Sequence, residues 1–205
     1  MPLSPPQARQ LIHTRTVTCQ GYEREDGLWD IEGHMVDTKS YSFPNRDRGG
    51  RIQAGEPLHG MRIRLTIDTD LLIHAAEQST DFAPHAYCHE VPHFVHGLVG
   101  QRIGPGWTQR CKNLMGGSSG CTHITELLGP MATTAYQTLV KVHFRKTTQP
   151  ETAPAATTET DSNRKPRFIG SCHALQESSP VVRDHYPHCY RAPAPETGAQ
   201  TRSAP

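Results

Sequence analysis

The feature that most restricts the fold is a run of alternating residues at positions 59–68, HGMRIRLTID. Apolar side chains fall on one side and polar ones on the other: Met61, Ile63, Leu65 and Ile67 against Arg62, Arg64 and Thr66. A period of two is typical of a strand with one buried face. Asp68-Thr69-Asp70 is a turn signal, and LLIHAAEQST after it reads as a second strand. Residues 61–80 therefore predict a β-hairpin.

Two further strands are predicted nearer the start of the chain. Residues 14–18 have a strand-like pattern, and in residues 28–36 apolar Trp29, Ile31 and Met35 alternate with polar residues. The dipeptide Asp26-Gly27 between them favours a tight turn. Residues 44–57 are too rich in Gly, Pro and charge for a helix or strand, so we expect a loop.

Helical patterns follow the hairpin. Residues 94–99 predict a short helix that ends at Gly100, and a loop is expected through Trp107. From residue 124 to residue 142 the apolar residues return at helical spacing, and Gly129-Pro130 should kink or restart this helix. These patterns predict an α+β fold in which a small antiparallel sheet with a central hairpin is covered by two or three helices.

Composition divides the chain into five parts. Residues 1–12 predict a disordered lead, and residues 13–146 predict a single α+β core domain. Residues 147–167 form a low-complexity, polar, proline-containing linker. Residues 168–190 recover apolar residues and are expected to pack back on the core, and residues 191–205 predict a disordered tail.

Charge and hydropathy limit the classes of partner. The formal net charge of +1 provides no field for binding nucleic acid or an anionic membrane. No segment reaches the roughly 18 consecutive apolar residues of a membrane helix, and the first residues lack the apolar centre of a secretion signal. We expect a cytoplasmic protein with reduced cysteines and a small-molecule substrate. Pairing of hairpin edges makes a homodimer possible.

A thiol and an imidazole stand where the long helix should begin, in GGSSGCTHITELLGP at residues 116–130. The free N–H groups of a first helical turn favour the thiolate form of Cys121, which is both a nucleophile and a metal ligand. Cys121 could also be a small buried residue, but the neighbouring His123 favours a functional site.

Two more candidate ligands lie at predicted ends of elements. His59 comes just ahead of the strand that starts at Met61, and Cys88 lies between the hairpin and the first helix. If these ends converge, His59, Cys88, Cys121 and His123 offer the nitrogen and sulfur ligands that zinc or iron prefers. The leading hypothesis is a metal-dependent lyase or hydrolase in which His59, Cys121 and His123 act in catalysis. Structural roles for His59 and Cys88 stay open.

Other polar clusters are weaker candidates. His85, His89, His93 and His96 are interpreted as solvated surface because Pro92 interrupts a helix, with His89 the one that could lie beside the ligands. Cys172-His173 could complete the site, and Asp26, Asp30 and Asp37 are turn or strand-end carboxylates without an evident acid–base pair. The run GGSSG could cradle a phosphate, although no lysine follows it.

Two alternative functions stay open. One is a module that binds iron or zinc for a partner without catalysing a reaction. The other is metal-free catalysis with Cys121 as the nucleophile and His123 or His59 as the base. Residues two apart on a helix point to different sides, which ranks this alternative last.

Four blocks carry a resemblance to a known family: REDGLWDIEGHMVDTKSY, AGEPLHGMRIRLTID, GCTHITELLGPMATTAYQTL and SCHAL. In this order they resemble a bacterial domain-of-unknown-function family, over roughly residues 13–146 and 168–187. The resemblance implies kinship and assigns no activity.

The order of elements is also similar to that of the iron-sulfur cluster assembly scaffold proteins. That resemblance implies a cluster or metal held near His59, by Cys88, and by Cys121 with His123. The pair here is Cys-x-His, and the Cys-Gly-Asp of the scaffolds is missing at the first position, so cluster donation is not implied.

Overall fold

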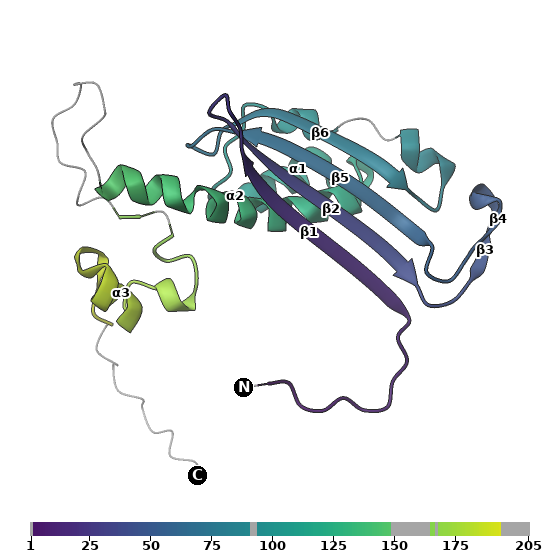
Figure 1. Cartoon of the computed structure of the whole chain (residues 1–205), viewed down its shortest axis with the longest axis horizontal. Coiled ribbons are helices and arrows are strands. Elements are labelled where there is room, and N and C mark those ends of the chain that lie inside the picture. The colour runs from purple at the N-terminus through teal and green to yellow at the C-terminus, as the bar shows by residue number, and fades with distance from the viewer. Residues whose placement is uncertain (1, 91–93, 149–164, 167, 194–205) are drawn as a thin grey trace, which may run out of the picture. The chain divides into compact units, whose positions relative to one another are not determined.

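The computed structural model describes residues 2–90, 94–148, 165, 166 and 168–193 (Figure 1). The chain divides into two compact units, residues 1–146 and 147–205. In the first unit the strands and α-helices are β1 (His13–Glu23), β2 (Trp29–Lys39), β3 (Phe43–Asn45), β4 (Gly50–Ile52), β5 (Pro57–Ile67), β6 (Ile73–Phe82), α1 (Trp107–Met115) and α2 (Thr122–Thr148). The helix α3 (Pro180–His185) belongs to the second unit. No helix among the described residues is long and apolar enough to span a membrane.

The first unit is built on a four-stranded antiparallel sheet with the order β1-β2-β5-β6. The predicted hairpin is present, as β5 pairs with β6, and the two earlier predicted strands also pair, β1 with β2, around the Asp26-Gly27 turn, where Gly27 has φ 82°. The residues expected to form a loop contain the small β3–β4 hairpin around a 3₁₀ turn, Arg46–Arg48. The predicted α+β fold class is confirmed.

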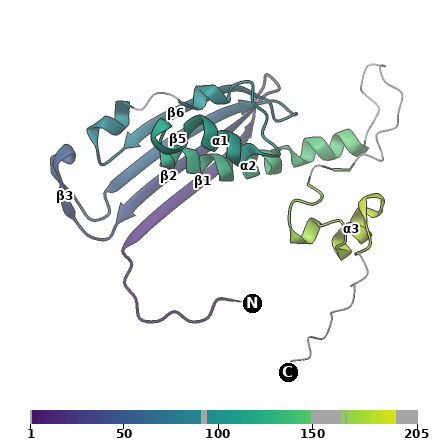
Figure 2. The ribbon, with the colours of Figure 1, turned by 180° about the vertical axis from the view of Figure 1, so that it is seen from behind.

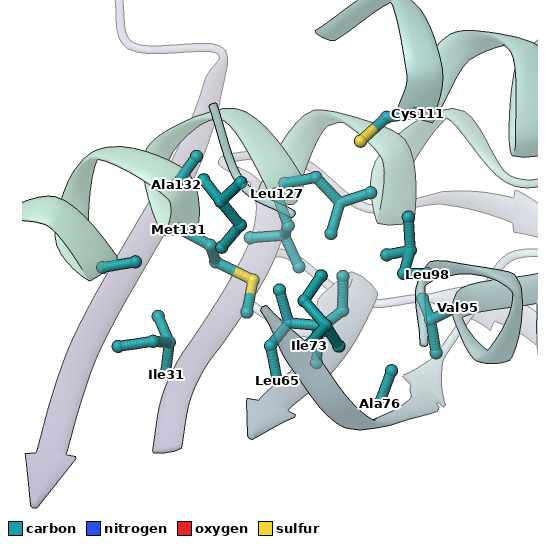
Figure 3. Packing of buried hydrophobic residues seen from close by; sticks show 14 of the residues in the cluster. Ile31, Leu65, Ile73, Ala76, Val95, Leu98, Cys111, Leu127, Met131 and Ala132 are labelled. Carbon is teal, nitrogen blue, oxygen red and sulfur yellow. The ribbon is translucent and has the colours of Figure 1, made fainter. Parts of the chain in front are cut away.

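Helices α1 and α2 cover one face of the sheet (Figure 2). Alternate residues of β2 and β5 face these helices, and Ile31 and Leu65 are fully buried there. Figure 3 shows Leu127 and Met131 of α2 packed over side chains of the sheet. The indole N–H of Trp107 in α1 donates to the Leu128 carbonyl of α2 over 2.9 Å, which ties the two helices together.

The helical predictions need three corrections. The predicted loop ends before Trp107, and residues 107–115, for which no helix was predicted, form α1 because Trp107, Cys111 and Met115 recur at helical spacing and are buried. The short helix before Gly100 is a 3₁₀ helix, Phe94–Leu98, and Gly100 follows it with φ 80°. Pro130 lies inside α2, which runs without a restart because buried residues on both sides of the proline anchor it to the sheet.

Helix α2 crosses the sheet closely at two glycines. A Cβ atom on Gly21 would lie 1.9 Å from Oγ1 and 2.8 Å from Cβ of Thr138. A Cβ atom on Gly33 would lie 2.6 Å from the sulfur of Met131. A β-branched threonine has few rotamers, whereas methionine is flexible.

Gly21→Ala should therefore lower the free energy of unfolding by about 1–3 kcal/mol through overpacking. Gly33→Ala is the matched comparison, and its loss should be smaller because the end of Met131 can move aside. Urea denaturation followed by circular dichroism measures both. An equal loss in the two variants would contradict this account of the packing.

The second unit has a small apolar cluster of its own, formed by Ile169, Val182 and Cys189. Its helix α3 begins after Ser179, whose hydroxyl accepts a hydrogen bond from the Val182 amide over 3.1 Å. Packing of residues 168–190 on the core stays a prediction. Most of the predicted linker (149–164 and 167) and of the predicted tail (194–205) lies outside the described residues.

Candidate metal centre

Three strands place polar side chains in one row on the helix-covered face of the sheet. In the strand register Arg15 of β1 lies opposite Asp37 of β2, and Asp37 lies opposite His59 of β5. Directly opposed residues of antiparallel strands point to the same face and lie close together. The next row along these strands consists of Val17, Met35 and Met61. The polar row therefore stands at one end of an otherwise apolar surface.

Asp37 is the centre of this row. Its side chain is 1% exposed, and its two oxygens accept hydrogen bonds from Nε and an Nη of Arg15, both over 2.8 Å. His59 Nδ1 lies 3.0 Å from Oδ2, and His13 Nε2 lies 3.3 Å from Oδ1. Burial acts to raise the pKa of this carboxyl group, but the hydrogen bonds and charge of Arg15 outweigh it and hold the pKa at about 2. Asp37 is therefore a carboxylate at neutral pH.

The first turn of α2 brings the remaining groups to the row. His123 Nε2 lies 3.9 Å from Asp37 Oδ2, and the His123 ring lies against the His59 ring with centroids 3.9 Å apart. One turn further, Glu126 forms an ion pair with Arg15. The helix start is fixed by Thr125, whose amide and hydroxyl both donate to the Cys121 carbonyl. Strand β1, strand β2, strand β5 and α2 thus meet at one site.

Asp37, His59 and His123 form a group that could hold a metal ion. Each offers one ligand atom, and these atoms all lie within 4.8 Å of one another. Metal–ligand bonds of about 2.0–2.1 Å in a tetrahedral shell place neighbouring ligand atoms about 3.4 Å apart. The distances of 3.0 Å and 3.9 Å from the Asp37 carboxylate bracket that value. Two imidazoles and one carboxylate are a ligand set that suits zinc or ferrous iron.

Burial and neighbouring groups shift the pKa of His59 and the pKa of Cys121. Burial lowers the pKa of His59, and the neighbouring His123 lowers it further, so the neutral imidazole that a metal requires is favoured. Cys121 Sγ lies 3.8 Å from His123 Nδ1. Burial acts to raise the pKa of the Cys121 thiol, but hydrogen bonds from His123 and from the amides of Ile124 and His123 lower it overall.

The residues predicted from the sequence reach different places. His59 and His123 belong to the ligand group, although His59 lies inside β5 and not ahead of it. Cys121 contacts His123 but supplies no ligand atom to the group. Cys88 lies on a separate 3₁₀ turn after β6, Ala86–Glu90, and is not a member either. The group therefore contains two of the four predicted ligands, His59 and His123, together with Asp37.

The weaker candidates also lie elsewhere. His85 pairs with Asp47 at 3.5 Å, and His89 shares the exposed turn that carries Cys88. His93 lies outside the described residues. Cys172 is exposed in the second unit, and all six cysteines are free. Gly117–Ser119 of the glycine-serine run forms a 3₁₀ turn before α2.

Asp37 is the functional candidate that the sequence patterns did not single out. It continues the buried positions Trp29, Ile31, Gly33 and Met35 of β2, so a charged residue stands in phase with an apolar face. A buried charge requires a partner, so the position of Asp37 in the apolar pattern of β2 is the sequence signal that could have identified it.

The fold and the site define an α+β domain with a buried aspartate linked to two histidines beneath a helix start. The chain belongs to a family described as "Protein of unknown function (DUF2889)", which matches residues 13–137. The predicted kinship with a domain-of-unknown-function family is thus confirmed over these residues, while the part of the resemblance that rests on residues 168–187 stays a prediction. All three residues of the candidate site fall inside the matched range.

No curated protein sequence and no solved structure matches the chain. The similarity to the iron-sulfur scaffold proteins therefore gains no support and stays a prediction.

Proposed function

We propose that the domain binds one zinc or ferrous iron ion through Asp37, His59 and His123 and works as a metal-dependent lyase or hydrolase on a small molecule. The observation that supports this most is the convergence of three ligand atoms within 4.8 Å from two strands and a helix. Cys121 and Cys88 are left out of the ligand set, because neither belongs to the group.

Each residue around the ion would have a defined role. A metal held by three protein ligands keeps a position for water or substrate, where it acts as a Lewis acid. Arg15 holds both oxygens of Asp37 and fixes the orientation of this carboxylate, as partners behind a ligand commonly do. Glu126 in turn pairs with Arg15, which links α2 to β1 beside the site.

Metal content of the purified, untagged protein tests the proposal. We expect about one zinc or iron ion per chain by elemental analysis, and a trace amount after His59→Ala. His74→Ala is the matched control, because His74 of β6 lies 3.0 Å from Asp68 and belongs to no group of three possible ligands among the described residues. Protein that stays free of metal after incubation with zinc or ferrous iron would reject the site. A visible absorption band after anaerobic loading with iron and sulfide would instead favour the assembly module.

A second candidate function rests on a different observation. Cys121 Sγ is 3.8 Å from His123 Nδ1, and the opposite nitrogen of that ring is 3.9 Å from Asp37 Oδ2. A thiol, an imidazole and a carboxylate in this order are the parts of a cysteine nucleophile with its base and the group that orients the base. Cys121 and His123 are only two positions apart, but Cys121 precedes α2, so the rule that residues two apart on a helix point to different sides does not apply to it.

Iodoacetamide distinguishes the two functions in metal-free protein. If Cys121 is the nucleophile, it should be alkylated at pH 7 faster than the exposed Cys172, as measured by peptide mass spectrometry. Cys111 is the internal control, because burial raises the pKa of its thiol to about 11 and it should stay unmodified. An inert Cys121 beside an alkylated Cys172 would remove this candidate.

A further inference from the structure

Strand β1 is a long edge strand in which the inward-pointing charge of Arg15 is already paired with Asp37 and Glu126. It pairs with β2 residue for residue from His13 to Glu23, without a bulge, and no other strand in the described part of the chain pairs with it. Its sequence, HTRTVTCQGYE, contains no proline and no lysine. Natural edge strands are commonly short or carry lysine, proline or a bulge. An edge of 11 residues without these devices is a template for another strand.

The backbone groups that face the free edge can be assigned. The Ile12 carbonyl accepts from the Ser40 amide at one end, and the Arg24 amide donates to the Leu28 carbonyl at the other. Residues of an antiparallel strand turn their backbone groups alternately to the two sides. Even-numbered residues of β1 therefore bond to β2, and the odd-numbered residues from His13 to Glu23 present their backbone groups outward.

Apolar side chains lie on and next to this strand. Val17 and Tyr22 within it are each 44% exposed, and Leu11 and Ile12 just before it are also exposed. The side chain of Val17 points to the face of the sheet that the helices cover. It is nevertheless exposed, because the helices do not extend over it. Among the residues that the structure describes, this edge thus combines backbone groups without a strand partner and exposed apolar side chains.

We infer that a second copy of this chain pairs with β1 in antiparallel fashion, so that two four-stranded sheets become one. An isologous contact of this kind has its two-fold axis perpendicular to the sheet, which keeps the helices of both copies on the same side. Full overlap of the strand places the axis at Thr18. Val17 then lies opposite Cys19 of the partner subunit, and His13 lies opposite Glu23 of the partner subunit.

Charge supports a second copy as the occupant. The strand carries Arg15 near its beginning, where Asp37 and Glu126 also pair with it, and Glu23 at its end. Antiparallel pairing of two identical strands brings each basic end to an acidic end, and opposite charges on facing strands are stabilising. A strand is therefore complementary to itself in this orientation, whereas parallel pairing would align like charges. The inference does not depend on a metal at the candidate site.

Cysteine crosslinking of the full chain tests the register. Thr18→Cys places two thiols face to face at the axis, where non-hydrogen-bonded neighbours have Cα atoms about 4.5 Å apart. We expect a disulfide-linked dimer under mild oxidation, reversed by dithiothreitol. Thr14→Cys is the control, because its partner position is Tyr22, and it should form no more crosslinked dimer than the unmodified chain. Equal crosslinking in both variants would overturn the register.

Sedimentation equilibrium tests the dimer itself. The unmodified chain should sediment as a dimer at micromolar concentration, and Val17→Lys should shift it to a monomer by placing a charge at the pairing edge. Val181→Lys is the matched control, because Val181 is 39% exposed in the second unit, and it should stay dimeric. Circular dichroism checks that both variants fold. A monomer in the unmodified chain, or a dimer that survives Val17→Lys, would overturn the inference.

Discussion

Replacing His123 with alanine should weaken zinc binding by more than about 100-fold and leave the fold intact. Loss of a partner behind a metal ligand commonly costs 10–100-fold in affinity, so loss of the ligand itself should cost more. The fold should tolerate the change because His123 is only partly buried, in the first turn of α2. Competition with a chromophoric chelator measures the affinity, and thermal unfolding checks the fold.

His74→Ala is again the control for this experiment, since His74 pairs with Asp68 at 3.0 Å outside the group of Asp37, His59 and His123. Its zinc affinity should equal that of the unmodified chain. An affinity for His123→Ala within threefold of the control value would mean that His123 is not a ligand.

Asp37→Ala should both abolish metal binding and lower the free energy of unfolding by about 2–3 kcal/mol. Removing one partner of a buried ion pair commonly costs 3–5 kcal/mol, because the other charge is left unpaired. Arg15 is 36% exposed and can regain water, which reduces the expected loss. Urea denaturation of the metal-free protein measures the change in the free energy of unfolding without any contribution from metal binding.

Asp81→Ala is the comparison for Asp37→Ala. Asp81 also accepts a hydrogen bond from an arginine, Arg62, over 2.7 Å, but this pair is on the exposed side of the sheet. Exposed pairs contribute only about 0–1 kcal/mol. A loss for Asp37→Ala no larger than for Asp81→Ala would contradict a central role of the buried carboxylate.

The sheet could be predicted from the sequence because its strands have one buried and one open face. Alternation in residues 28–36 and 59–68 shows directly which side chains face the helices. Helix α1 could not be found in this way, because its nine residues include only three buried ones among polar neighbours. Its position depends on contacts with α2, such as the Trp107 hydrogen bond, that no local pattern reports.

The candidate site was only partly within reach for a similar reason. His59 and His123 are predictable because histidine is a common metal ligand and both stand near the ends of predicted elements. The position of Asp37 opposite His59 depends instead on strand register. Register between β2 and β5 involves strands separated by residues 40–56, and their pairing is set by the packed core. Cys88 is a suitable ligand near the end of an element, yet it is not a member of the ligand group.

A crystal of the zinc-loaded protein, with diffraction recorded on both sides of the zinc absorption edge, tests the central claim most directly. The account predicts one anomalous peak within bonding distance of the Asp37 carboxylate and of an imidazole nitrogen from each of His59 and His123. A zinc-loaded crystal with no peak at this position, or with its peak at Cys88 or in the second unit, would contradict the account.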